Sequence, residues 1–150
     1  DRGGNDYEFN RISLDARGYL PLGSHQRVLA ARVFSSQDRP DSGSQVPFFL
    51  KQTLGGSEML RGYPPFRFRD DNLFYISAEY RWEPAPAFEL ALFYDTGRVY
   101  PDGESFAFEH FKKSIGFGLR FKTSRQVIMR FDIGRSEEST LLQFRFGPAF

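Results

Sequence analysis

The chain has 150 residues, with 20 lysines and arginines against 19 aspartates and glutamates, and it contains no cysteine. This length suits a single domain, and the formal net charge of +1 gives no reason to expect a nucleic acid as a partner. The lack of cysteine excludes a disulfide framework, thiol catalysis and cysteine metal sites. Phenylalanine is frequent, at 18 residues, yet the mean hydropathy is −0.48. Strands with one apolar and one polar face produce this combination.

Polar and apolar residues alternate in seven segments, and each segment predicts a β-strand with one polar face. In chain order the segments are 7–20, 26–35, 74–83, 88–97, 114–121, 127–134 and 142–147. The stretch 36–73 has no period, and within it Leu54–Asp71 combines glycines and prolines with arginines and phenylalanines. A loop of this length in a compact fold is functional or disordered, and its aromatic content favours a functional loop.

The predicted connections differ in length on the two sides of the sheet. Short turns and longer loops alternate along the chain, at 21–25, 36–73, 84–87, 98–112 and 122–125, and a medium connection follows at 135–140. Outer-membrane barrels have this layout, with the short turns on the periplasmic side. We therefore predict an all-β, antiparallel transmembrane β-barrel of the outer membrane, whose carboxyl terminus lies on the periplasmic side.

A soluble sandwich or a lipocalin-like barrel shows the same alternation, so the pattern alone leaves two arrangements open. One face of the segments carries charges of both signs, whereas the other is continuously aliphatic and aromatic. The charged face lies either in solvent, around an apolar core, or in a polar lumen, with the apolar face in lipid. Aromatic residues near the strand ends favour the membrane arrangement, because they resemble interfacial girdles; they are Tyr80, Trp82, Tyr94 and Phe150.

Four local motifs, in this order, resemble those of one protein family. Leu60–Tyr63 contains an Arg-Gly-Tyr motif, Phe93–Gly97 has the pattern F-x-D-x-G, and Gly116–Phe121 has two glycines followed by a hydrophobic residue and arginine. The last residues, Phe144–Phe150, resemble a closing strand with a terminal aromatic residue. With these motifs the chain resembles the outer-membrane assembly barrels of the BamA/TamA type, the bacterial surface antigen family.

The resemblance implies a barrel of sixteen strands in which loop 36–73 is the sixth extracellular loop and enters the lumen. Residues 1–150 then form a partial barrel domain, the carboxyl-terminal seven strands, without the periplasmic POTRA repeats that receive clients in that family. Seven strands cannot close in the usual antiparallel way, and an open edge in lipid leaves backbone groups unpaired. We therefore expect a fragment, a truncated product or an assembly of chains.

Arg61 is the first candidate site residue. It is either a loop arginine at the surface or a guanidinium that pairs with a carboxylate inside the lumen. The alternation places Asp95 and Glu89 on the polar face, and the resemblance nominates Asp95 as the partner. A bidentate arginine–carboxylate pair in a partly dry lumen would hold the loop in one geometry.

The other candidate residues surround this pair or belong to the last strand. Gly62 shapes a tight turn, and Tyr63 completes the loop motif. The resemblance implies a strand motif of Gly116, Gly118 and Arg120, a seam near Gly147 that opens for clients, and a terminal sorting signal at Phe150. Gly147 is equally well explained as a simple strand end.

The sequence shows no sign of catalysis. It contains no G-x-S-x-G motif and no glycine-rich phosphate loop before a helix, and His25 and His110 have no partners at metal-ligand spacing. We therefore expect no enzyme activity, no cofactor and no metal.

The resemblance implies a function in the insertion or translocation of client proteins at the outer membrane. The implied partners are outer-membrane lipid, client proteins and, through the terminal strand, the assembly machinery. The alternatives are a passive anchor or pore fused to another domain and, with less support, a soluble ligand-binding barrel.

Overall fold

The computed structural model describes residues 9–23, 26–40, 44–104, 107, 109–123 and 127–147. Seven strands form one antiparallel sheet in the order β1-β2-β5-β6-β7-β8-β9. Their bounds are Phe9–Pro21 (β1), Arg27–Pro40 (β2), Asn72–Ala85 (β5), Phe88–Tyr100 (β6), Lys112–Lys122 (β7), Val127–Ser136 (β8) and Thr140–Phe146 (β9). Each strand lies on one of the alternating segments, so the prediction of seven antiparallel strands is confirmed.

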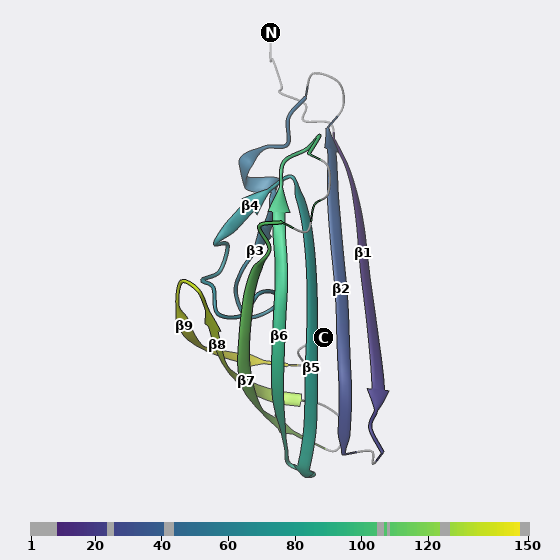
Figure 1. Cartoon of the computed structure of the whole chain (residues 1–150), viewed down its shortest axis with the longest axis vertical. Helices are drawn as coiled ribbons and strands as arrows, with labels where there is room; N and C mark the ends of the chain where they lie inside the picture. Colours follow the sequence, from purple (N-terminus) through teal and green to yellow (C-terminus); the bar gives the residue numbers. More distant parts are fainter. Residues whose placement is uncertain are drawn as a thin grey trace.

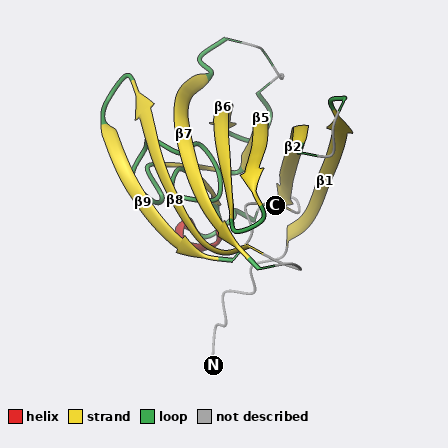
Figure 2. Ribbon diagram, turned by 90° about the horizontal axis from the view of Figure 1, so that it is seen from below, coloured by secondary structure: helices red, strands yellow, loops and turns green. Residues whose placement is uncertain are grey.

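The sheet curves strongly, and its strands run as a wall from β1 to β9 (Figure 1). Seen along the strands, the wall is an open arc with the connection between β2 and β5 inside it (Figure 2). Two short strands in that connection, β3 (Gln52–Leu54) and β4 (Phe68–Asp70), pair with each other. In the described residues β1 and β9 are the edges of the sheet, so the total number of strands in a closed barrel stays a prediction.

The long connection is shorter and more structured than loop 36–73, the predicted one. β2 continues to Pro40 and β5 begins at Asn72, so both predicted loop boundaries are wrong. The connection contains the 3-10 helix η1 (Phe48–Leu50) besides β3 and β4. Among the residues described, no helix is long and apolar enough to cross a membrane.

Inward-facing polar residues explain why β2 is longer than its sequence indicates. Ser36 Oγ lies 2.8 Å from Ser13 Oγ across the β1–β2 pair. Asp38 is fully buried and accepts a hydrogen bond from Arg11 Nε at 2.6 Å. Polar residues of this kind suggest a loop in a soluble protein, but they suit a strand whose inner face is polar.

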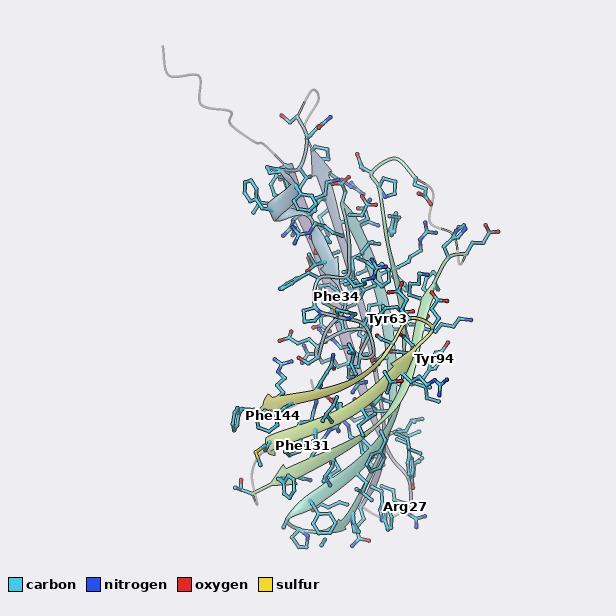
Figure 3. All side chains as sticks on the ribbon, turned by 90° about the vertical axis from the view of Figure 1, so that its left-hand side faces the viewer. Arg27, Phe34, Tyr63, Tyr94, Phe131 and Phe144 are labelled. Carbon is cyan, nitrogen blue, oxygen red and sulfur yellow. The ribbon has the colours of Figure 1, made fainter. Side chains whose placement is uncertain are left out.

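The two faces of the sheet have opposite character. Outward side chains are apolar and exposed: Leu92 is 58% exposed and Tyr94 43%, whereas Tyr63, inside the curve, is fully buried (Figure 3). Many inward side chains of β5 to β8 are polar and buried: Ser77, Glu79, Asp95, Ser114, Arg120, Arg130 and Asp132. A soluble sandwich or lipocalin-like barrel requires the reverse, so the structure has the arrangement with a polar interior and an apolar face for lipid.

We expect Leu14→Arg to destabilise the chain in lipid by about 2–4 kcal/mol, because Leu14 lies in the middle of β1, 62% exposed, and arginine is costly near the bilayer midplane. Leu20→Arg is the matched control: Leu20 is 58% exposed on the same face of the same strand, but it lies at the end of β1, next to the turn. Near the interface the cost falls to about 0–1 kcal/mol. Urea unfolding in phospholipid vesicles measures both changes, and equal costs would contradict a lipid-facing outer surface.

Candidate functional site

Residues 54–65, here called the inner loop, pack against the concave face of the sheet. Three of their side chains, Leu54, Leu60 and Tyr63, are fully buried and pack with residues at the start of β5. The Tyr63 ring also meets the ring of Phe68 edge-on, with 5.1 Å between centroids. The buried apolar cluster consists of Leu54, Leu60, Tyr63, Leu73 and Tyr75. The inner loop therefore has a small hydrophobic core of its own inside the otherwise polar wall.

Two carboxylates of the sheet bind the guanidinium of Arg61. Its Nε donates to Oδ2 of Asp95 at 2.8 Å and its Nη2 to Oδ1 at 2.7 Å, which makes a bidentate pair. Its Nη1 donates to Oε1 of Glu79 at 2.5 Å, and its backbone N–H also donates to Asp95, at 3.1 Å. Arg61 is 2% exposed, and both carboxylates are fully buried. One side chain thus joins the inner loop to both β5 and β6.

The guanidinium of Arg61 also stacks on an aromatic ring, that of Phe93. The Cζ atom of Arg61 lies 3.6 Å from the centroid of the Phe93 ring, a cation–π contact. Phe93 is paired in register with Gly116 of β7, and a Cβ at position 116 would lie 2.3 Å from Phe93 Cζ. The ring of Phe93 therefore fills the space that a side chain at position 116 would need. Arg61 in turn stacks on this ring.

Glycines on the loop and on β8 let the two backbones touch. Gly62 has φ +111°, a conformation that favours glycine, and its carbonyl accepts hydrogen bonds from the hydroxyls of Ser136 at 2.9 Å and Ser139 at 2.8 Å. A Cβ on Gly134 would lie 2.7 Å from the backbone of Arg61 and Gly62. Any other residue at position 134 would push the inner loop away from β8.

Ion pairs continue from Glu79 along the inner wall. Its Oε2 accepts from Arg120 Nη2 at 2.7 Å and from Arg81 Nε at 2.8 Å, and Arg120 Nη1 donates in turn to Glu89 at 2.7 Å. The connected groups are four cations and four carboxylates, so their formal charges cancel: Arg61, Arg81, Arg120 and Lys122 with Glu79, Glu83, Glu89 and Asp95.

Glu89 does not contact Arg61, so its prediction as an alternative partner is wrong. It lies six positions from Asp95 on the same strand, about 20 Å away. The sheet register places it opposite Arg120 instead. Glu79, which lies opposite Phe93, takes the second place at the guanidinium. The alternation puts Glu79 on the polar face, but only the register shows which loop residue it meets.

Gly118 makes room for another ion pair. It lies opposite Asp132 of β8, and a Cβ at position 118 would be 2.4 Å from Asp132 Oδ1. Arg130 Nε donates to Asp132, and Arg130 Nη2 donates to the backbone carbonyl of Ser57 in the inner loop at 2.5 Å. Both glycines of the predicted strand motif thus leave space for a side chain of the neighbouring strand.

The last two candidate residues lie away from this cluster. Gly147 follows β9 with φ +96°, which favours glycine, and no atom comes within 4 Å of the place of its Cβ. Phe150 is outside the described residues. The structure therefore brings together the loop motif, Asp95 and the strand motif, and adds two residues that the sequence did not single out, Glu79 and Gly134.

An apolar outer face around a polar, ion-paired interior defines the chain as part of the wall of a membrane β-barrel. Residues 1–150 match the model of the Omp85 superfamily domain, and the chain belongs to that superfamily. It is similar to the crystal structure of BamA from Haemophilus ducreyi lacking POTRA domains 1–3, with a TM-score of 0.77 and 18% sequence identity. The match covers 97% of this chain and 36% of that one. No curated protein matches the sequence.

Family and fold thus confirm the predicted resemblance to a BamA-type barrel of the outer membrane. At this level of identity the likeness to BamA shows the fold alone, and the chain spans little more than a third of that protein's chain.

We expect Gly134→Ala to displace the inner loop, because the new methyl group would meet the Arg61–Gly62 backbone at 2.7 Å. Overpacking of this kind costs about 1–3 kcal/mol. Gly18→Ala is the control, since Gly18 is also within a strand but has no atom within 4 Å of its Cβ position. Protease cleavage of the inner loop and urea unfolding measure the effect; identical behaviour of the two variants would contradict the close contact.

Proposed function

We propose that this chain is part of an outer-membrane barrel that inserts client proteins into the outer membrane or translocates them across it. Membership of the Omp85 superfamily and an outer surface suited to lipid support this function. The proposal assigns no catalytic residue and no cofactor to the chain. Its partners are outer-membrane lipid and client proteins in an extended or partly folded state.

The observation that carries this proposal is the anchoring of the inner loop by Arg61. The loop connects the middle of the wall to its last strands: Arg61 binds Asp95 and Glu79, while Ser136 of β8 donates to the carbonyl of the adjacent Gly62. Arg145 of β9 donates to Glu58 of the loop. Displacing the loop would leave two buried carboxylates without their partner, so the buried, doubly paired Arg61 holds the loop against the wall.

We propose β9 as the strand where clients and the assembly machinery engage. In the described residues it pairs with β8 alone, and an unpaired edge is a template for another strand. Its outward side chains are strongly exposed, with Leu142 and Phe146 both at 72%. Gly147, directly after the strand, and Phe150 fit a seam and a terminal signal in this proposal. The carboxyl terminus then lies on the periplasmic side, with the short turns.

The test is Arg61→Ala in the full-length protein. Removing one partner of a buried ion pair costs about 3–5 kcal/mol, so we expect the inner loop to leave the wall. If the bound loop loses only ~1.4 kcal/mol of stability, the displaced loop becomes about tenfold more populated. The rate of protease cleavage in the loop should therefore rise at least tenfold. The rate of client-barrel insertion into proteoliposomes should fall in parallel.

Arg67→Ala is the matched control for this experiment. Arg67 follows the inner loop and pairs with Glu138 at 2.7 Å, but it is largely exposed, and exposed pairs contribute little. It should keep the insertion rate and the protease protection of the unmodified protein. Unchanged insertion and an intact loop in Arg61→Ala would refute the anchoring role, and an unmodified protein without insertion activity would favour a passive anchor or pore.

A further inference from the structure

A shallow hollow lies on the outer, lipid-facing surface of the sheet. It has a volume of about 160 Å³ and crosses β5, β6 and β7. The register pairs Tyr80 with Leu92 and Leu92 with Phe117, so the walls belong to neighbouring strands. No charged residue lines the hollow; the lining residues are Tyr80, Trp82, Leu90, Ala91, Leu92 and Phe117. Its shape and chemistry suit an alkyl chain.

An arginine, Arg27, lies next to Trp82 at one end of this hollow. Arg27, the first residue of β2, is paired in register with Trp82, so both side chains project from the outer face of the sheet. Arg27 is exposed, and Figure 3 shows it at the end of the molecule where β2 and β5 meet the short turns. No carboxylate among the described residues forms a salt bridge with it. Its charge is therefore not neutralised by any carboxylate that the structure describes.

An aromatic residue and an arginine at this depth lie where the bilayer meets water. Trp82 is three residues from the end of β5 and 39% exposed, as expected for an indole at the headgroup level. The hollow extends from Trp82 towards Leu92, hence away from the turn and into the hydrocarbon region. An apolar groove that begins beside a cation is complementary to a lipid with an anionic headgroup: the groove suits the acyl chain and the cation suits the headgroup.

We propose that this surface binds one anionic glycerophospholipid. The guanidinium of Arg27 binds the phosphate through charge-assisted hydrogen bonds, and one acyl chain lies in the hollow between Trp82 and Phe117. The commitment to an anionic lipid rests on charge, because an unpaired arginine next to a bilayer favours net negative headgroups. The site is separate from the inner loop and from the edge strand, so it does not depend on the proposed client function.

Trp82, the single tryptophan of the chain, reports directly on occupancy of the site. The protein is reconstituted into phosphatidylcholine vesicles that contain a small fraction of phospholipid with brominated acyl chains, which quench indole fluorescence on contact. We expect brominated phosphatidylglycerol to occupy the site about fivefold better than brominated phosphatidylcholine, the preference that one arginine at the surface provides. Subtracting the signal of Trp82→Phe isolates the emission of this indole.

Arg27→Gln should abolish the preference for phosphatidylglycerol, and Arg27→Lys should keep most of it, because the charge remains. Arg135→Gln is the matched control: Arg135 is exposed on the outer face of β8, beside Ile115, at the opposite end of the wall. It should leave quenching unchanged. Equal quenching by both brominated lipids in the unmodified protein would overturn the proposal, and so would a preference that survives Arg27→Gln in a normally folded variant.

Discussion

The buried guanidinium of Arg61 is the contact on which the interior of this wall depends. A charge removed from water costs several kcal/mol unless carboxylates and hydrogen bonds replace its hydration. Here Asp95 and Glu79 supply both, and Glu79 is itself neutralised by Arg120 and Arg81. Each member of the set compensates another, so the loss of one leaves a buried charge without its partner. This coupling is the physical basis for our proposal that Arg61 anchors the inner loop.

The inverted polarity of the sheet explains why such a set of charges exists at all. An apolar outer face uses the hydrophobic residues that a soluble domain would place in its core, so the interior must be held together by other means. Ion pairs, the small cluster around Tyr63 and direct backbone contact at Gly134 take this role. Irregular backbone is tolerated here because it lies against protein and polar groups rather than lipid.

The two ends of the sheet connect this interior to the surrounding membrane. β1 and β9 carry unpaired backbone groups on one side within the described residues, and such groups are costly in lipid. The inner loop reaches β9 through Glu58, while the groove at Trp82 lies on the far face of the same wall. The inner loop therefore links the edge strand β9 to β5 and β6, and these two strands carry part of the groove on their outer face.

Alternation with period two was enough to predict seven strands and to place Asp95 on their polar face. It left open whether that face points inward, and the resemblance to a family nominated Asp95 as the partner of Arg61. A period describes which way side chains point, not which strand positions lie side by side, because it is the same for every register. Sheet pairing therefore decided that Glu79 rather than Glu89 meets Arg61, and that Gly134 touches the loop. It also decided that residues 36–40 belong to β2: their polar side chains match a loop as well as a strand, and only their partners across the sheet distinguish the two.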